Sequence, residues 1–341
     1  MLLLLTKPFA LAAAATFWVG VPTIFFVSSG NWSAYSNLPS NFSSSGASCS
    51  QCHAGSAPSA QSSRMSVTAG SHALSAGQST QVTAALDSSG TNTVFGGFLC
   101  EATAGAFNAG GNTQTANGVS TISISHVDRN SRDWTFDFVA PATPGLVELT
   151  AAGLASSGSS SSGDYMSFSG FDKTATSATP ARLYVLPSGV TNIGSSCSDG
   201  YGNVSVLGAS DSPTVGNAGF ELRLHGAAPG AMAFAWGAAG PGGFSASLDP
   251  IGLTGCNAYV NGVTGMQTAM TSTGLAMRAD GSAAFALPIP SNPALLGSKY
   301  HVQTGYIDPS VGSAIPAGST VPGLPRSLDV SLSNGLEITI Q

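Results

Sequence analysis

Apolar and polar residues alternate in short runs along most of this chain, and no window after the N-terminal segment keeps a 3.6-residue period. The clearest run is Asp133 to Val139, in which Trp134, Phe136 and Phe138 occupy alternate positions and the polar residues Thr135 and Asp137 lie between them. A period of two is the spacing of side chains on one face of a β-strand. Turn residues separate these runs, which is typical of an antiparallel sandwich. The sequence therefore predicts an all-β fold.

The alternating runs fall into two groups, on either side of Pro180 and Pro187. The runs are residues 81–86, 119–127, 133–139 and 146–150 in the first group and 220–225, 283–287, 300–306 and 327–340 in the second. A length of 341 residues is also typical of about two domains. We therefore expect one β-sandwich over residues 63–180 and a second over residues 190–341.

The last of these runs contains Asn334-Gly335 between two alternating stretches. Asn-Gly is the strongest short-range signal for a two-residue β-hairpin, because both residues tolerate positive φ. We therefore expect the chain to reverse direction at this dipeptide.

The N-terminus is typical of an export signal over residues 1–29. Lys7 is the only charge before an apolar run from Pro8 to Val27, and Val27-Ser28-Ser29 offers small residues for cleavage. An uncleaved membrane anchor is the alternative, because the run approaches the roughly 20 residues that span a bilayer. Either way we expect a periplasmic, cell-surface or extracellular protein, with membrane contact only through this segment if it is uncleaved.

An irregular segment, residues 30–62, carries the motif Cys49-Ser50-Gln51-Cys52-His53. C-x-x-C-H is the attachment signal for haem c: two thiols form thioethers to one haem, and the histidine binds its iron. We expect one covalent haem on Cys49 and Cys52, with His53 as the proximal ligand. The alternatives are a disulfide beside a chance histidine, or a zinc site, which needs about four ligands.

The sixth iron ligand is expected to come from the first sandwich. His126 is the first candidate, because it ends a strand-like run and shares a parity with Ile122 and Ile124, at the rim of a core. His72 and Met65 are the alternatives. His225 and His301 fall on polar faces of the second group of strands, where we expect them to be solvated.

The remaining cysteines are Cys100, Cys197 and Cys256. Cys197 and Cys256 both belong to the second group of strands and are the natural disulfide in an oxidising compartment. Cys100 is then left over, and its apolar surroundings predict a buried, unreactive thiol.

Composition and motifs exclude several classes of function. The net charge is −6 and no basic patch exists, which argues against a nucleic-acid partner. Only 8% of residues are charged, and no arrangement of Ser, His and Asp has the nucleophile elbow of a hydrolase. We therefore do not expect an enzyme.

Residues 49 to 168 resemble the reeler (reelin-like) domain of bacterial exported proteins, a group close to the choice-of-anchor V family. The matching pieces, in order, are Cys49–His53, Gly96–Ala102, Ala104–Phe107, Ile124–His126, Trp134–Pro141 and Ser162–Tyr165. The resemblance implies an immunoglobulin-like sandwich that is exported or surface-attached and often preceded by C-x-x-C-H. The family pattern commonly has a tryptophan near its Ala-Pro, where this chain has Phe138.

The second region looks like an uncharacterised domain of large bacterial exported proteins. The matching pieces are Thr254–Tyr259, Leu287–Gly297, Tyr300–Gln303 and Ser331–Ile340. This resemblance implies another β-sandwich and no catalytic activity.

Two functions are compatible with these features. The first is an exported mono-haem c-type protein that passes electrons to a redox partner. The second is a structural or adhesion module that binds a surface component and has no redox activity.

Overall fold

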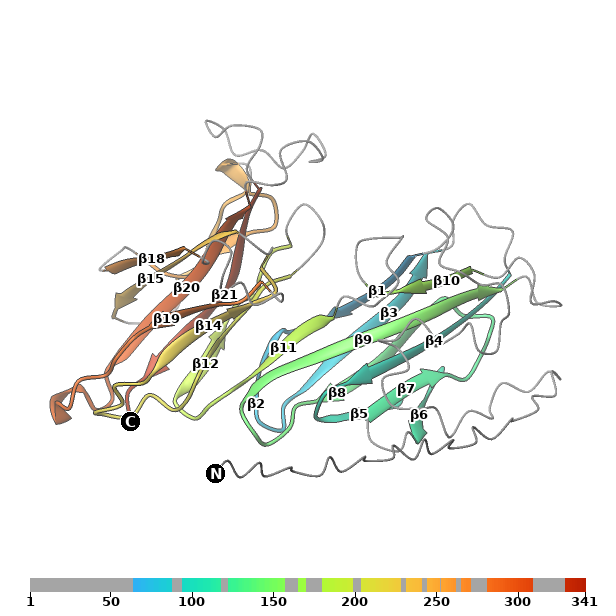
Figure 1. The fold of residues 1–341 in the computed structure, drawn as a ribbon, viewed down its shortest axis with the longest axis horizontal. Coiled ribbons are helices and arrows are strands. Elements are labelled where there is room, and N and C mark those ends of the chain that lie inside the picture. The colour runs from blue at the N-terminus through green and yellow to red at the C-terminus, as the bar shows by residue number, and fades with distance from the viewer. Residues whose placement is uncertain are drawn as a thin grey trace, which may run out of the picture. The chain divides into compact units, whose positions relative to one another are not determined.

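The computed structural model describes residues 64–87, 94–117, 122–156, 165–169, 180–198, 204–227, 231–240, 244–251, 253–261, 265–270, 281–308 and 329–341. Regular structure in these ranges is β-strand (Figure 1), apart from the short 3-10 helices η3 (Asp249–Ile251) and η4 (Pro293–Leu295). No helix in the described ranges has the length and apolar character needed to cross a bilayer. The all-β prediction is confirmed. The expected export signal and the Cys49–His53 motif lie outside the described residues.

Two sheets form a first sandwich. One has the order β1-β3-β8-β5 and the other β2-β11-β9-β4-β7-β6, with β10 also paired to β9. Their bounds are β1 Arg64–Ala69, β2 Ala73–Ser75, β3 Ser79–Asp87, β4 Phe95–Ala102, β5 Ala106–Asn108, β6 Thr113–Asn117, β7 Ile122–His126, β8 Asp133–Val139, β9 Gly145–Ser156, β10 Tyr165–Phe168 and β11 Ala181–Leu186. Every pairing in these two sheets is antiparallel except that of β11 with β2.

The core of the first sandwich follows from the alternation in the sequence. In β8 the aromatic residues Trp134, Phe136 and Phe138 are buried, while the residues between them face outward. The opposite sheet contributes Phe98, whose ring lies 4.6 Å from that of Trp134 and 5.8 Å from that of Phe136. Each buried aromatic ring contributes about 1.5–3 kcal/mol through loss of apolar surface from water. These side chains therefore hold the two sheets together, as their parity predicts.

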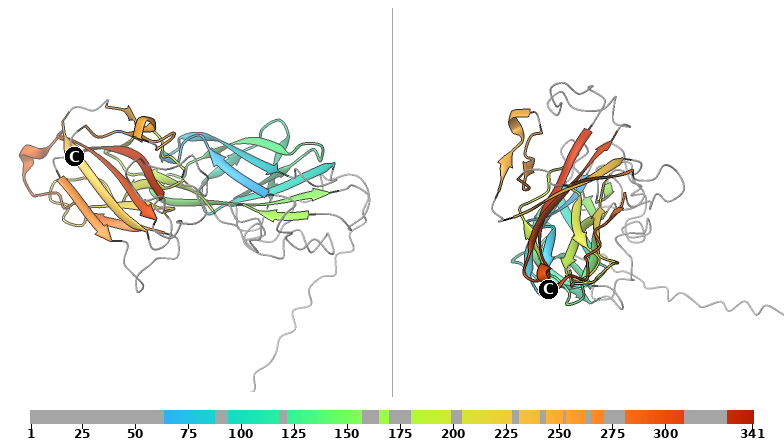
Figure 2. Two further views of the ribbon diagram at one scale, coloured as in Figure 1. Left: turned by 90° about the horizontal axis from the view of Figure 1, so that it is seen from above. Right: turned by 90° about the vertical axis from the view of Figure 1, so that its left-hand side faces the viewer.

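A second pair of sheets follows in the chain. A five-stranded sheet has the order β12-β21-β20-β15-β18, and a three-stranded sheet the order β13-β14-β19. Their bounds are β12 Val190–Ile193, β13 Val206–Ala209, β14 Glu221–His225, β15 Met232–Ala239, β18 Gly265–Met270, β19 Ala283–Ala286, β20 Lys299–Asp308 and β21 Asp329–Thr339, with a small ribbon of β16 (Ala246–Ser247) and β17 (Asn257–Ala258). The long strands β20 and β21 lie side by side in Figures 1 and 2. One hydrophobic cluster collects buried residues from both sheets, so they form a second sandwich.

Strand β11 contributes side chains to both cores. Leu183 and Val185 belong to the core of the first sandwich, and Tyr184 and Leu186 belong to the core of the second. The hydroxyl of Tyr184 donates to the carbonyl of Ala209 at 2.9 Å. The stretch where we predict a domain boundary thus contains a strand, and the ranges 63–180 and 190–341 stay a prediction.

The hairpin prediction at Asn334-Gly335 is wrong, because β21 continues through both residues from Asp329 to Thr339. Gln303 pairs with Gly335 and Gly305 with Leu332, so the dipeptide lies at an irregularity of the β20–β21 ladder. Two contacts favour the straight path over a turn. The Asn334 side chain bonds to the backbone of Leu207 in the facing sheet, and a Cβ on Gly335 would lie 2.8 Å from Ile193 and Tyr259.

Candidate functional site

His126 is the described residue with the strongest sequence case for binding a ligand, and it lies at the end of β7, half buried. Its Nδ1 is 3.1 Å from both the amide nitrogen and the carbonyl oxygen of Phe98. The ladder between β4 and β7 begins one residue further on, at Leu99 and Ser125. The imidazole therefore takes the place of a backbone partner for Phe98 at the end of the ladder.

Glycine and aromatic neighbours define the surroundings of this imidazole. A Cβ on Gly97 would lie 2.8 Å from Cε1 of His126, so a residue without a side chain is needed for the ring to approach the strand. The rings of Trp134 and Phe98 lie 6.3 and 6.5 Å away. Burial lowers the pKa of His126 below its usual value, against the opposing effects of the Phe98 hydrogen bond and of Asp128. The neutral imidazole, the form that binds metals, is therefore favoured.

The two alternative sixth ligands occupy different surroundings. Nδ1 of His72 donates to the carbonyl of Arg182 at 2.8 Å, and burial lowers the pKa of His72. Met65 is fully buried, and a Cβ added to Gly153 would lie 2.8 Å from the Met65 sulfur. Met65 packs in the core, and it could bind an iron only by leaving a cavity there. We therefore assign it a packing role.

The structure does not bring His72 and His126 together. His72 directly precedes β2, and three strands, β11, β9 and β4, separate β2 from β7 in the sheet. Four strand spacings amount to about 19 Å. These two histidines therefore belong to different sites.

The cysteine predictions are confirmed where the structure describes them. Cys197 and Cys256 form a disulfide. Cys100 is a buried free thiol in the first core, and burial raises its pKa, which disfavours the reactive thiolate.

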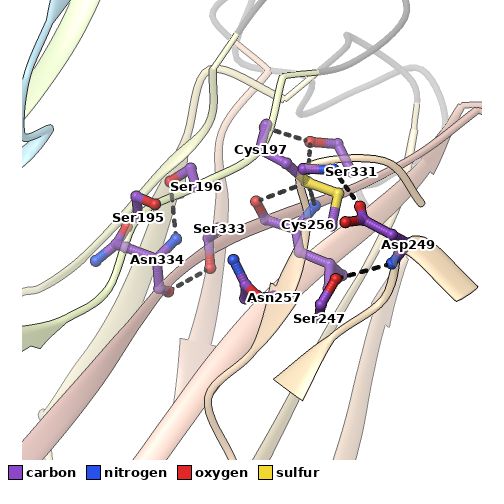
Figure 3. Close-up of a disulfide and its surroundings, with 12 residues drawn as sticks. Ser195, Ser196, Cys197, Ser247, Asp249, Cys256, Asn257, Ser331, Ser333 and Asn334 are labelled. Carbon is purple, nitrogen blue, oxygen red and sulfur yellow. Dashed lines mark hydrogen bonds between the residues drawn. A yellow bond between two sulfur atoms is a disulfide. The ribbon is translucent and has the colours of Figure 1, made fainter. Parts of the chain in front are cut away.

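A polar network surrounds the disulfide (Figure 3), and the sequence analysis does not predict it. The Ser331 hydroxyl donates to the carbonyl of Cys197 at 2.9 Å, and the Ser196 hydroxyl accepts from the amide of Asn334 at 2.8 Å. Asn334 itself is 1% exposed, and its side-chain amide bonds to Leu207 and Asn192. This network ties the 196–197 segment and β13 to β21.

Gln303 forms a second buried link on β20. Its side-chain oxygen accepts from the amide of Tyr259 at 2.9 Å, and its nitrogen donates to the carbonyls of Asn257 and Ser333, each at 2.9 Å. The segment that carries Cys256 is thereby attached to the five-stranded sheet by hydrogen bonds as well as by the disulfide. Buried amides with their bonds made to the backbone hold segments in register.

The expectation that His225 and His301 are solvated is wrong, because they are 7% and 4% exposed. The His225 ring stacks on Tyr184 with centroids 5.8 Å apart. Nε2 of His301 lies 3.0 Å from Oε2 of Glu337, whose other oxygen accepts from Nζ of Lys299 at 2.6 Å. Alternation assigns these histidines to the less apolar face of a strand, but it does not reveal which partner covers that face.

The side chains that could take part in chemistry are therefore dispersed over the described part of the chain. No cluster of three or more His, Cys, Asp or Glu side chains suited to a metal ion occurs among the described residues. The His126 imidazole bonds to the Phe98 backbone, and Glu337 bonds to Lys299 and His301. The disulfide, Asn334 and Gln303 join strands.

Comparisons with known proteins add little to this description. No protein-family model matches the sequence, and no curated protein matches it. Among solved structures, the human F-spondin reeler domain is similar at 18% identity over 36% of this chain and 88% of that chain, with a TM-score of 0.27. The Yersinia pseudotuberculosis adhesin InvE is similar at 12% identity over 81% of this chain and 59% of that chain, with a TM-score of 0.23. Likenesses at these TM-scores carry no argument about function.

Proposed function

We propose that this chain is an exported structural module, with an adhesive or assembly role at the cell surface and no catalytic step. The observation that carries the proposal is the use of its buried polar groups. Asn334 and Gln303 each bond to backbone groups of another segment, beside the Cys197–Cys256 disulfide. Such groups make a sandwich rigid and specify one arrangement of its strands.

The position of strand β11 also supports a structural role. Because Leu183 and Tyr184 point into different cores, the first and second sandwiches share a strand that both must keep in place. A shared, buried strand resists independent motion, which suits a module that bears load or spaces one partner from another.

The expected compartment fits this role. A disulfide forms and persists outside the reducing cytoplasm, in accord with the export signal that we expect over residues 1–29. The resemblance to reeler domains implies an exported or surface-attached protein as well. A surface component, or another molecule of the same matrix, is the partner class that we propose.

The experiment is an attachment assay with cells of an export-competent bacterium that displays the full chain. We expect displayed protein to raise attachment of cells to one another or to a solid surface above the empty-vector level. The variant Cys197→Ser/Cys256→Ser should reduce that gain in proportion to its loss of folded protein. Attachment equal to the vector, with folded protein detected on intact cells by antibody, would contradict the proposal.

Haem carriage by Cys49, Cys52 and His53 is the second candidate function, and one observation favours it. The chain enters the first sandwich at the end where His126 lies: Met65, the second residue of β1, packs on Gly153, which pairs with Phe98, whose backbone binds the His126 imidazole. The motif thus precedes a strand that starts close to a neutral, half-buried histidine.

In this function Cys49 and Cys52 would hold the haem, and His53 would bind its iron. Haem would supply a one-electron change at iron, and the chain's part is to hold and cover it. An absorption spectrum tests this function: a Soret band that survives denaturation and is absent from Cys49→Ser/Cys52→Ser supports it. Colourless protein with Cys49 bonded to Cys52 contradicts it.

A further inference from the structure

Asn334-Gly335 is a chemically reactive pair that the second sandwich buries. In Asn-Gly the glycine nitrogen can attack the side-chain amide carbon of the asparagine, because glycine has no side chain to hinder the approach. The new C–N bond closes a succinimide ring and ammonia leaves, and water then opens the ring to aspartate or isoaspartate. The sequence contains three such pairs, at residues 117–118, 261–262 and 334–335.

Hydrogen bonds hold the Asn334 side chain in a position that opposes this attack (Figure 3). Its oxygen accepts from the amide of Leu207 at 2.8 Å, and its nitrogen donates to the Leu207 carbonyl at 3.2 Å and to Oδ1 of Asn192 at 2.9 Å. Asn334 is also 1% exposed. An amide that reacts here must give up these bonds inside a buried site, which is costly.

The backbone of Gly335 is constrained as well. Strand β21 lies between β12 and β20, and Gly335 pairs with Ile193 on one side and with Gln303 on the other. A Cβ on Gly335 would lie 2.8 Å from both Ile193 and Tyr259, so neighbouring side chains pack closely on this residue. Ring closure has to rotate the peptide bond between Asn334 and Gly335, and this part of β21 would then have to leave the sheet.

We propose that Asn334 is a deamidation site that the folded second sandwich keeps closed and that unfolding opens. An aspartate at this position would place a carboxylate against the Leu207 carbonyl, where the asparagine donates a hydrogen bond. An isoaspartate would in addition insert an extra backbone carbon into β21 and disturb its register. A chain modified at residue 334 therefore cannot rebuild the link between β21 and β13, and this reaction makes unfolding of the second sandwich irreversible.

Asn261-Gly262 offers an internal comparison, because it has the same two residue types. Asn261 is exposed, whereas Asn334 is buried. In the unfolded chain the two pairs differ only in their sequence neighbours, so both should react. In the folded chain the surroundings differ, and Asn261 should react faster than Asn334.

The experiment incubates the full chain at mildly alkaline pH, either folded in buffer or unfolded in guanidinium chloride. Peptide mapping by mass spectrometry measures the deamidated fraction at residues 261 and 334. We expect deamidation at both residues in denaturant, and at residue 261 with little at residue 334 in the folded protein. After the denaturant is removed, the refolded fraction should be depleted in chains modified at 334, but not in chains modified at 261.

The variant Cys197→Ser/Cys256→Ser tests the closure without a refolding step. Loss of the disulfide should increase the population in which the second sandwich is open. The rate of deamidation at 334, relative to the rate at 261, should therefore be higher in this variant than in the wild type under native conditions.

Three results would overturn the inference. Equal rates at 334 and 261 in the folded wild type would show that the fold does not close the site. An unchanged ratio of the two rates in a variant with a lower melting temperature would show that unfolding does not open it. Modification at 334 that is as frequent in refolded chains as in chains that fail to refold would show that the reaction does not prevent refolding.

Discussion

At the scale of single residues, sequence parity predicts burial well and polar partners poorly. Trp134 and Phe136 are in the core as their alternation predicts, because apolar area removed from water does not depend on the partner. His301 is buried with its ring bonded to Glu337, which is 36 residues away in the sequence. Which polar group meets which depends on strand order, and one sequence does not specify that order.

Asn334→Asp should destabilise the second sandwich by about 2–4 kcal/mol, because a carboxylate would face the Leu207 carbonyl and the Asn192 side chain in a buried site. Chemical denaturation measures the change. Asn292→Asp is the matched control, since Asn292 is exposed and its oxygen only accepts from Ala294. Equal stability of the two variants would contradict the structural role of Asn334.

The Glu337 group should make stability depend on pH. Hydrogen bonds from Lys299 and His301 lower the pKa of Glu337 in the folded protein. The unfolded chain then binds the proton more readily, so this stabilisation is present above the unfolded pKa and is lost as pH falls through the folded value.

Melting temperatures between about pH 5 and pH 3 test the point, since glutamate ordinarily titrates near pH 4.3. The melting temperature of Glu337→Gln should fall less steeply with decreasing pH than that of the wild type. Parallel curves for the two proteins would show that this group makes no contribution.

At the scale of elements, tertiary contacts override short-range turn signals. Asn-Gly at residues 334–335 predicts a hairpin, yet the asparagine is needed for hydrogen bonds to the facing sheet and the glycine for close approach to Ile193 and Tyr259. The same two residue types therefore serve a strand irregularity. A local pattern cannot distinguish these uses, because the partners are 76 or more residues away along the chain.

The disulfide links elements that lie 59 residues apart in the sequence. Closing a loop of that length should stabilise the folded state by about 2–4 kcal/mol, mainly by restricting the unfolded chain. Cys197→Ser/Cys256→Ser should therefore melt at lower temperature than the wild type. Reductant should lower the melting temperature of the wild type and leave that of the variant unchanged. A wild-type melting temperature that reductant does not change would contradict this account.

At the scale of the whole molecule, the sequence predicts the fold class and the two groups of strands, but not the role of β11. Leu183 and Tyr184 are consecutive apolar residues in a short run between two prolines. That pattern is compatible with a linker or with a strand buried on both sides. Only the structure shows that alternate side chains enter different cores.

Tyr184→Ala should expose this coupling. It removes the bond to Ala209 and leaves a cavity beside Gly208, at a cost of about 3–5 kcal/mol. Differential scanning calorimetry should give one cooperative transition for the wild type and two resolved transitions for the variant. Two transitions in the wild type itself would show that β11 does not couple the sandwiches.

The central claim is that this chain acts as a structural module, and attachment of displaying cells in two folded variants tests it most directly. Cys49→Ser/Cys52→Ser removes any haem link, and Tyr184→Ala weakens the shared strand. The account predicts wild-type attachment for the first variant and reduced attachment for the second, at equal surface amounts. Loss of attachment in the thiol variant, with full attachment in Tyr184→Ala, would contradict it and assign the function to the haem motif.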